Sequence, residues 1–575
     1  MKRACGILLA IMFVLAFIYC QRSLAMPPHP DRVEEMAVLK ALGEPYIDFD
    51  SLAEVRRAKG IDKPGDINMS TLIAANDTIN ILAILIQFQD DSAQTAAEYF
   101  DTLIYANRQG SVTHYYLENS YGVLHIGTLT LPSEFGWLTS SEDASFYTAG
   151  GDNGLGTYPN NAQRLVEEAV DLADPMVDFS LYDNDNNNYV DGLIIVHAGR
   201  GAEYSMNEDD IWSHKWGISP RNKDGVFVST YTMMPEYFTL AGDMTCGVFV
   251  HELGHVFGLP DLYDRDYSSR GLGKWSVMAS GSWNGINGSS PAHFDAWSKI
   301  QLGFATALNV TSTMMGASIP RVETNPVIYR LWTNGLPGTE YFLVENRQKT
   351  GYDSYLPGSG LLIYHIDDTQ DDGSGSPDND DEWYPPDHTS SGNYLVALEQ
   401  ADSLWQLEQN LSYGDGGDPF PGSEGNHNFS PLTRPNSNDY ADNNTLVAVT
   451  NISNSGPNMS ADFTVSFASA AEDEIEIEDE VIPEQFDLAQ NSPNPFNAET
   501  KISFAVAEPG AVRLEIYNVV GQKIKTLTSG LYAPGRYEIY WDGTSDNGQA
   551  LASGLYFYRL KTLEGTICKK MLLMK

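Results

Sequence analysis

The chain contains 575 residues, and its 77 acidic and 34 basic side chains give it a formal net charge of −43. Charge of this sign repels phosphate backbones and leaves no basic stripe on the sequence, so we expect no binding to nucleic acid. Hydrophobic residues make up 42% of the chain and aromatic residues 11%, which excludes a disordered protein. A chain of this length divides into about two to four folding units.

Residues 1–25 have the three parts of a secretory signal peptide. Lys2 and Arg3 form the basic start, residues 7–19 an apolar run, and residues 23–25 a small-x-small cleavage site. The alternative is a membrane anchor, but the run is shorter than the roughly 20 residues that span a bilayer. No later apolar stretch is long enough to span one, so the sequence predicts a secreted protein, extracellular or on the cell surface, with no transmembrane segment in the mature chain.

Residues 26–78 are mixed in composition and favour helix, with an amphipathic stretch at 33–40 and a helix-breaking Lys63-Pro64-Gly65-Asp66. This segment suits a propeptide that precedes the catalytic domain. The alternative is an N-terminal arm of the mature protein, because the sequence holds no decisive cleavage signal.

Residues 79–310 alternate between strand and helix signals. A nearly continuous apolar block at 79–88 is typical of a strand buried on both faces, and a second such strand is expected at 192–197. Helices are expected at about 95–105 and 161–172. This alternation predicts an α/β or α+β fold, which we interpret as the catalytic domain.

The remainder of the chain is rich in strand signals. Residues 311–468 are expected to be a β-rich continuation of the catalytic region. Residues 469–485 are expected to be a solvated linker, because 472–484 carry eight acidic and no basic side chains. Period-two patterns in residues 486–575 predict a small all-β, Ig-like sandwich. The individual strands are expected at 360–365, 393–398, 511–519, 535–541 and 554–560, with a hairpin turn at 546–548.

The segment His251-Glu252-Leu253-Gly254-His255 carries a metal-binding pattern. On a helix the two histidines lie one turn apart on one face, so both can present imidazole nitrogens to one zinc ion. Glu252 is then placed where a carboxylate can take a proton from zinc-bound water. The alternative is a surface helix with two chance histidines, but the apolar residues 248–250 that precede the motif indicate a buried helix.

A zinc ion with hydrolytic activity needs a third protein ligand and an open position. Gly258 and Pro260 should end the helix sharply, which allows the chain to turn back and bring Asp261 to the metal. Asp264 and Asp266 are also near, but we prefer Asp261.

The stretch HELGHVFGLPDLYD at 251–264, followed by KWSVMASGSW at 274–283, resembles the immune inhibitor A-like (InhA-type) metallopeptidases. The resemblance covers roughly residues 79–465. It implies a secreted zinc endopeptidase made as a zymogen, in which His251 and His255 are zinc ligands and Glu252 is the catalytic residue.

The same resemblance implies a zincin-like, metzincin-type catalytic domain. Met278 would then form the floor of a Met-turn beneath the zinc, although an ordinary core methionine is the alternative. A tyrosine that donates to the oxyanion is sometimes present in such enzymes. Tyr263 is near in sequence, but nothing in the sequence fixes its direction.

Residues 183–191 place oxygen side chains at alternate positions, as a calcium loop does. Asp183, Asp185, Asn187 and Asp191 supply side chains, and Tyr189 can offer its carbonyl. The loop departs from the EF-hand pattern because Asn188 replaces the usual glycine and Ile194 stands where the bidentate glutamate belongs. Calcium is the preferred interpretation, and an Asx-rich turn before a strand is the alternative.

The C-terminal motifs Asn491-Ser492-Pro493-Asn494-Pro495-Phe496, Trp541-Asp542-Gly543 and Ser553-Gly554-Leu555-Tyr556 resemble sorting domains of the type IX (Por) secretion system. Similar strand motifs occur in Ig-like flagellar hook-capping modules. The resemblance implies that this module takes the chain across the outer membrane with the help of the type IX machinery. The alternative is an adhesion or stability module built on the same sandwich.

These observations predict a secreted zinc endopeptidase acting on proteins or peptides, with Zn²⁺ and Ca²⁺ as its metals. A zinc amidase that acts on cell-wall material is a competing hypothesis, because the site alone does not exclude it. A surface adhesin with a structural zinc is the non-catalytic alternative, and it predicts a closed site with four ligands.

Overall fold

The computed structural model describes most of the chain after residue 25. The described residues are 26–42, parts of 46–73, 78–371 except 266, residue 379, 393–466, and 485–574 with gaps at 498, 508–509, 533–534, 546–548 and 563–564. The predicted signal peptide, nearly all of the acidic linker and the hairpin turn at 546–548 lie outside them. Within the described part, no helix is both long and apolar enough to cross a membrane.

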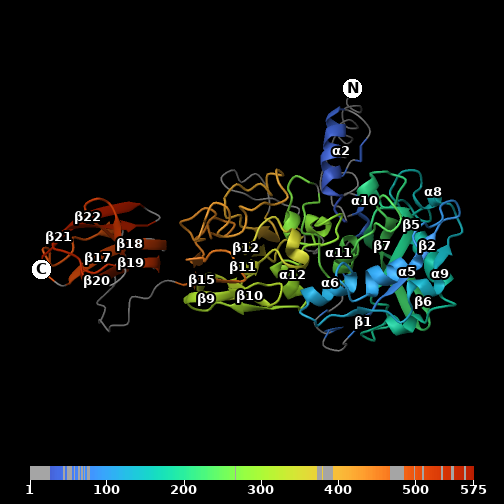
Figure 1. Ribbon diagram of the computed structural model, residues 1–575, viewed down its shortest axis with the longest axis horizontal. Helices are drawn as coiled ribbons and strands as arrows, with labels where there is room; N and C mark the ends of the chain where they lie inside the picture. The colour runs from blue at the N-terminus through green and yellow to red at the C-terminus, as the bar shows by residue number, and fades with distance from the viewer. Residues whose placement is uncertain are drawn as a thin grey trace, which may run out of the picture.

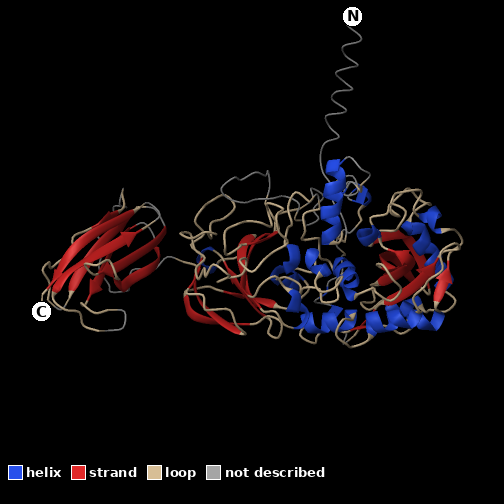
Figure 2. Cartoon of the chain, turned by 45° about the horizontal axis from the view of Figure 1, so that its top comes forward, coloured by secondary structure: helices blue, strands red, loops and turns tan. Residues whose placement is uncertain are grey.

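A five-stranded mixed sheet is the centre of the first half of the molecule (Figures 1 and 2). Four of its strands are parallel, and the edge strand β6 runs antiparallel to β7. In sheet order the strands are β4 (Trp137–Thr139), β2 (Leu82–Gln87), β5 (Leu193–Arg200), β7 (Val226–Tyr237) and β6 (His214–Lys223). The predicted strand 192–197 is thus present as part of β5.

The apolar block at 79–88 forms two strands and not one. β1 (Ile79–Asn80) pairs with β3 (Ile126–Gly127) in a separate ladder, whereas β2 belongs to the central sheet. Ile81 lies between the two strands, where the chain passes from one ladder to the other. Its carbonyl accepts a hydrogen bond of 2.8 Å from the Tyr105 hydroxyl. Both strands are nonetheless buried, as a continuous apolar run predicts.

Helices cover the sheet and carry the metal-binding motif. The predicted helix at 161–172 is α9 (Ala162–Ala173), which begins where the Asn161 side chain accepts a hydrogen bond from the Arg164 N–H. The predicted helix at 95–105 is α5 (Ala97–Phe100), which continues as a π-helix, η1 (Asp101–Tyr105). The other helices of this half are α2 (Pro30–Leu42), α6 (Val112–Asn119), α7 (Pro132–Phe135), α8 (Ala144–Tyr147), η2 (Phe179–Tyr182), α10 (Ala202–Ser205), α11 (Cys246–Val256), η3 (Gly273–Trp275), η4 (Ser280–Trp283) and α12 (Ala296–Gln301).

Two further sheets follow, and they share a core with the first half. One has the order β13 (Val396–Leu398), β12 (Gly360–Asp367), β11 (Glu340–Arg347), β10 (Val327–Leu331) and β8 (Thr306–Asn309), and the other has the order β14 (Ala448–Thr450), β15 (Asn458–Thr464) and β9 (Met314–Pro320). Short 3₁₀ turns η5 (Thr333–Gly335) and η6 (Gly351–Tyr355) lie between the strands. One continuous apolar cluster includes Leu343 and Leu362 of these sheets and Leu253 of α11, so the two halves pack as one body.

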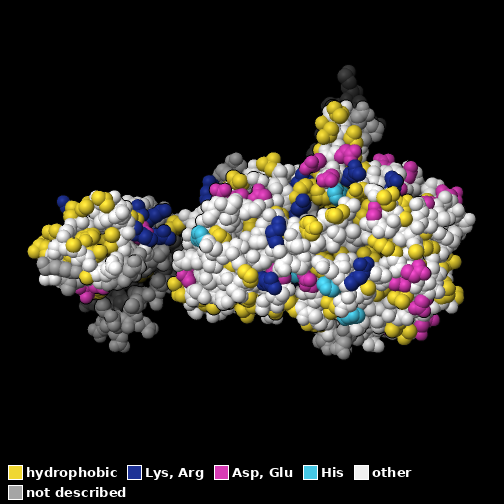
Figure 3. Space-filling model, viewed as in Figure 1, with side chains coloured by type: hydrophobic (Ala, Val, Ile, Leu, Met, Phe, Trp, Pro, Cys, Tyr) yellow, Lys and Arg dark blue, Asp and Glu magenta, His cyan; other side chains and the backbone are white. Residues whose placement is uncertain are grey.

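The C-terminal strands form a separate body at one end of the molecule (Figure 1). One sheet has the order β16 (Asp487–Leu488), β17 (Thr500–Val506) and β20 (Gly535–Trp541), and the other has the order β19 (Lys523–Tyr532), β18 (Gly510–Tyr517), β21 (Gly554–Lys561) and β22 (Thr566–Leu573). Both sheets contribute to one apolar core, with Trp541 and Tyr558 among its members. Lys and Arg side chains gather on the edge of this body that faces the rest of the chain (Figure 3).

Candidate metal centre

Helix α11 is the element that holds the two histidines. All of its residues are buried, including the apolar Val248, Phe249 and Val250 that precede the first histidine. His251 and His255 lie one turn apart on the same face, with their ring centroids 4.8 Å apart. The spacing of the motif therefore produces the expected pair of neighbouring imidazoles.

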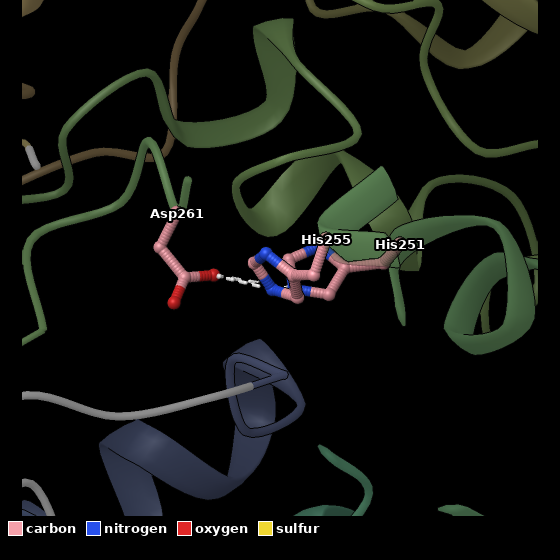
Figure 4. Close-up of side chains that lie close together, drawn as sticks. All are labelled: His251, His255 and Asp261. Atoms are coloured by element: carbon pink, nitrogen blue, oxygen red, sulfur yellow. Dashed lines mark ion pairs between the residues drawn. The ribbon is translucent and has the colours of Figure 1, made fainter. Parts of the chain in front are cut away.

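Asp261 reaches the same point from the loop after the helix. The helix ends at Phe257, and Gly258 follows with a φ of 97°, a left-handed conformation that favours glycine. The chain then turns back, so that Asp261 Oδ1 lies 3.3 Å from Nε2 of His251 and 3.3 Å from Nε2 of His255 (Figure 4). The structure thus brings together the three side chains that the sequence singled out.

The other nitrogen of each imidazole is bonded to a backbone carbonyl. His251 Nδ1 lies 2.8 Å from the Val277 carbonyl oxygen, and His255 Nδ1 lies 2.9 Å from that of Leu259. Because only a protonated Nδ1 can donate to a carbonyl, both Nε2 atoms are left as acceptors that can bind a metal. Two imidazole nitrogens and one carboxylate oxygen, all within 4.8 Å of one another, form a donor set that suits zinc.

The charge state of Asp261 is also that of a metal ligand. Burial by itself raises the pKa of this carboxyl, but the adjacent imidazoles of His255 and His251 outweigh burial and lower the pKa overall. The side chain is therefore a carboxylate at neutral pH, as coordination requires.

Glu252 and Met278 flank this centre. Glu252 follows the first histidine and is fully buried inside α11. Met278 is fully buried beneath the same helix, because a Cβ placed on Gly254 would lie 2.5 Å from the Met278 sulfur. The residue before it, Val277, supplies the carbonyl that holds His251. Met278 therefore packs against the helix that carries the two histidines, and its role in a Met-turn stays a prediction.

Asp264, the other acidic residue that the sequence offered and the structure describes, has different partners. Asp264 accepts hydrogen bonds from the Ser268 hydroxyl at 2.7 Å and from the Ser269 N–H at 2.6 Å, so its carboxylate stabilises the following turn. Asp266 lies outside the described residues. Tyr263 is buried, and its ring centroid lies 6.4 Å from that of His251.

The N-terminal segment contacts the metal helix, a feature that the sequence did not reveal. The Gly65 N–H donates to the His255 carbonyl at 2.8 Å. The Phe49 ring packs on Tyr267 with centroids 5.3 Å apart, and Tyr267 packs on Tyr263 at 5.9 Å. The described residues Gly65 and Phe49 therefore lie against the metal helix and the loop that follows it, and no local sequence signal could have predicted these long-range contacts.

The predicted calcium loop brings three carboxylates together. Oxygen atoms of Asp183, Asp185 and Asp191 lie within 4.8 Å of one another. Asn188 has a φ of 71°, so an asparagine occupies the left-handed position where an EF-hand has glycine. Asn187 donates its N–H to Asp183 and Asp185, which is also how an Asx-rich turn is built. Burial raises the pKa of Asp191 to about 6, which is expected for a carboxyl that lacks a cationic neighbour.

A third acidic group was missed by the sequence analysis. Asp402, Asp415 and Asp418 also have carboxylate oxygens within 4.8 Å of one another. The residues are separated along the chain and lack the alternate spacing of a calcium loop, so only the folded structure brings them together.

Comparison with known families matches two segments of the chain. Residues 95–304 match the model described as "Immune inhibitor A peptidase M6, catalytic domain". Residues 490–565 match the FlgD Ig-like domain. The first match contains the whole metal centre, and the second contains most of the C-terminal strands.

Curated relatives match part of this chain. Pre-pro-metalloprotease PrtV of Vibrio cholerae serotype O1 is 35% identical over 199 residues, which cover 28% of this chain and 21% of the relative. Immune inhibitor A of Bacillus thuringiensis subsp. alesti is 35% identical over 216 residues, which cover 32% of this chain and 30% of the relative. The chain therefore spans less than a third of the length of either relative.

Among solved structures, the flagellar protein FlgD of Xanthomonas campestris is 27% identical, over 15% of this chain and 64% of that chain, with a TM-score of 0.12. A score of this size adds nothing to the fold assignment. The segment that holds His251, His255 and Asp261 is therefore similar to the catalytic domain of the immune inhibitor A peptidases, and the curated relatives that match part of the chain include a metalloprotease.

Proposed function

We propose that the protein is a secreted zinc-dependent endopeptidase. The observation that carries the proposal is the convergence of His251 Nε2, His255 Nε2 and Asp261 Oδ1 inside a matched metallopeptidase domain. A zinc ion held by these atoms would polarise the scissile carbonyl and lower the pKa of a water molecule to about 7.

The residues around the metal site have separate roles in the proposed reaction. His251 and His255 are kept in the metal-binding tautomer by the Val277 and Leu259 carbonyls. Glu252 accepts a proton from the attacking water and returns it to the leaving amine. Met278 supports α11 from below at Gly254.

The alternatives make different demands on the site. A structural zinc needs four protein ligands, whereas the group in the described part of the chain offers three His, Cys, Asp or Glu ligands. A cell-wall amidase could use the same three ligands, but the curated relatives are named as a metalloprotease and an immune inhibitor. Peptide bonds are therefore the preferred substrate.

The test is casein cleavage by the full-length chain, before and after limited trypsin treatment. We expect new peptide termini with the wild type, and none with Glu252→Ala or in the presence of a chelator. Removing a positioned general base lowers the rate by about 10²–10⁴-fold, while zinc content should be unchanged. Intact casein beside folded, zinc-loaded wild type would favour the amidase or the adhesin.

We also propose that residues 26–78 are a propeptide. Gly65 bonds to the backbone of His255, and Met69 and Leu72 are buried in the core that contains α11. A segment held in this position would block substrate from the metal. Casein cleavage should therefore increase after trypsin treatment, and an unchanged rate would indicate an N-terminal arm instead.

Calcium at Asp183, Asp185, Asn187, Tyr189 and Asp191 is part of the same proposal. Three neighbouring carboxylates repel one another unless a cation neutralises them. We expect millimolar calcium to raise the melting temperature of the wild type more than that of Asp185→Asn. Equal shifts would favour the Asx-rich turn.

Export through the type IX system is proposed for residues 486–575. The FlgD Ig-like match supports an Ig-like module, and the sorting role depends on the sequence resemblance. In a host with this system, deleting residues 486–575 should retain the enzyme in the periplasm. Normal release of the deleted form would indicate a stability or adhesion module.

A further inference from the structure

Four aromatic side chains of the catalytic half receive the start of the N-terminal segment. These side chains, here called the aromatic cradle, are Tyr204 of α10, Trp212, Phe238 and Trp283 of η4. Three of them pack edge to face or tilted, with Tyr204–Phe238 centroids 5.3 Å apart and Phe238–Trp283 centroids 5.5 Å apart. Trp212 and Trp283 are almost completely buried.

The cradle holds the chain by its backbone. The Trp212 indole N–H donates to the Met26 carbonyl at 3.0 Å, and the Trp283 indole N–H donates to the Pro27 carbonyl at 2.7 Å. The Glu203 carbonyl accepts the His29 N–H at 2.9 Å. Because these bonds use main-chain atoms, another peptide with suitable backbone shape could make them equally well.

The bound sequence is Met26-Pro27-Pro28-His29, directly before Pro30, the first residue of α2, and all three prolines are buried. Proline fixes its own φ near −65° and pushes the preceding residue toward extended or polyproline II conformations. A polyproline II strand has no internal hydrogen bonds, so its carbonyls remain available to donors such as indole N–H groups. Aromatic surfaces that recognise such strands are a recurring mode of peptide binding.

The cradle lies beside the metal helix and is only partly filled. A Cβ on Gly247, in the first turn of α11, would lie 2.2 Å from the carbonyl oxygen of Ser282, the neighbour of Trp283. A cavity of about 700 Å³ is lined by Tyr204 and Phe238 on one side and by Met36 and Leu39 of α2 on the other. The cavity thus adjoins the Tyr204 and Phe238 side of the cradle, whereas the two indole donors are occupied by the Met26 and Pro27 carbonyls until the segment leaves.

We propose that the aromatic cradle is a substrate subsite that takes a proline-rich segment in the polyproline II conformation. The proposal rests on the proposed peptidase function, and it assigns residues 26–30 as the occupant before activation. When this segment leaves, the indole N–H groups of Trp212 and Trp283 lose the Met26 and Pro27 carbonyls as acceptors. A proline-rich stretch of substrate restores both hydrogen bonds.

A binding experiment tests the cradle without requiring catalysis. The full-length Glu252→Ala chain is cut with trypsin, and loss of the peptide that ends at Arg32 is checked by mass. Blocked peptides Met-Pro-Pro-His-Pro and Met-Ala-Ala-His-Ala are then titrated by calorimetry. We expect the proline peptide to bind about tenfold more tightly, because less conformational entropy is lost on binding. If the cut segment stays bound, its release by added proline peptide is the equivalent positive result.

Matched variants identify the donor. Trp283→Phe keeps an aromatic ring and removes the N–H. We therefore expect its affinity for the proline peptide to be about fivefold lower. Trp297→Phe is the control, because its indole N–H bonds to Asp368 away from the cradle. Equal affinities for the two peptides, or an unchanged affinity of Trp283→Phe for the proline peptide, would overturn the proposal. The cradle would then bind residues 26–30 alone.

An activity experiment separates this proposal from the proposed function. Two fluorogenic peptides that differ only in Pro-Pro-x-Pro against Ala-Ala-x-Ala are given to the trypsin-treated wild type. We expect a lower KM for the proline peptide, a similar kcat, and loss of the KM difference in Trp283→Phe. Failure to cleave either peptide or casein would count against the peptidase function, while the calorimetry still decides the cradle.

Discussion

His251 and His255 each use Nδ1 to bond a backbone carbonyl, and this detail determines what Asp261 can do. With both Nε2 atoms directed at Asp261 Oδ1, a metal at their meeting point needs no rearrangement of the imidazoles. The carbonyls come from Leu259, in the turn after the helix, and from Val277, in a distant loop. The sequence motif therefore specifies the ligands, whereas the fold specifies their tautomers.

Asp261 can be distinguished from Asp264 by substitution. We expect Asp261→Asn to weaken zinc binding by more than about tenfold, because it replaces an anionic ligand with a neutral one. Asp264→Asn should bind zinc normally but melt at a lower temperature, because Asp264 accepts hydrogen bonds from Ser268 and Ser269. Competition with a zinc-binding dye measures the first effect and calorimetry the second. The opposite pattern would make Asp264 the third ligand.

Glu408 is a buried carboxyl that should make stability depend on pH. Burial, with smaller contributions from the nearby Asp418 and Glu399, raises its pKa to about 8 despite a hydrogen bond from Gln400. Because the folded pKa lies above the unfolded value, its stabilising contribution is complete below about pH 4.3 and is lost as the pH rises through 8. We expect the melting temperature to fall by about 5 °C between pH 6 and pH 9.

Glu408→Gln should make this pH profile flatter, because a neutral side chain cannot be forced to ionise inside the protein. Glu424→Gln is the matched control, since Glu424 is exposed and close in sequence. Calorimetric scans at several pH values would measure both slopes. Parallel profiles for the wild type and Glu408→Gln would mean that other groups control the pH dependence.

At the scale of elements, local patterns predicted the helices and strands whose partners are near in sequence. The helix of the HExxH motif, α9, β5, β20 and β21 follow from periodicity, capping and burial. The long hairpin of β6 and β7 was missed, because residues 221–224 at its tip are polar and its apolar positions alternate irregularly. Contacts between segments far apart, such as Gly65 with His255, depend on tertiary packing and leave no local signal.

The attachment of the N-terminal segment to α11 should be sensitive to substitution at Gly65. A Cβ at this position would lie 2.2 Å from the Val256 carbonyl oxygen, which belongs to the backbone of α11 and cannot move freely. We expect Gly65→Ala to loosen the segment and to increase casein cleavage before trypsin treatment by about tenfold. The N-terminal segment should also be cut faster by trypsin.

Gly456→Ala is the control for this change, because nothing lies within 4 Å of a Cβ at that glycine. It should leave both the cleavage rate and the trypsin pattern unaltered. Faster trypsin cutting in Gly65→Ala without any gain in activity would show that the segment covers α11 but does not restrain catalysis.

At the scale of the whole molecule, a buried ionic network joins the two parts of the catalytic region. The Arg347 guanidinium of β11 bonds Asp353 with Nη2 at 2.7 Å and with Nε at 2.8 Å. Its Nη1 donates to Glu345 and to the Trp275 carbonyl, which lies near the metal centre in sequence. The Asp353 carboxylate also accepts the His293 N–H. The β-rich sheets therefore support the loops beneath α11.

Among the described residues, no buried ionic network of this kind joins the C-terminal body to the rest of the chain. Its apolar core consists of residues between 486 and 573 and shares none with the other clusters. The molecule should accordingly unfold in two transitions, one for the catalytic region including its β-rich sheets and one for the C-terminal strands.

Arg347→Met tests this division. Removing one partner of a buried ion pair leaves the other charges uncompensated and costs about 3–5 kcal/mol, so we expect the catalytic transition to move down by roughly 10 °C. Zinc should be released in that same transition, because the network and the metal centre belong to one cooperative unit. Calorimetry with a zinc-sensitive dye measures both, and the second transition should stay in place.

Arg559→Met provides the reciprocal change. Arg559 pairs with Glu515 at 2.9 Å inside the C-terminal body, and the exposed arginine should contribute less than about 1 kcal/mol. Arg559→Met should lower the temperature of the second transition only, and only slightly. Zinc release well before the β-rich sheets unfold would contradict the argument, because it would mean that these sheets do not support the metal centre.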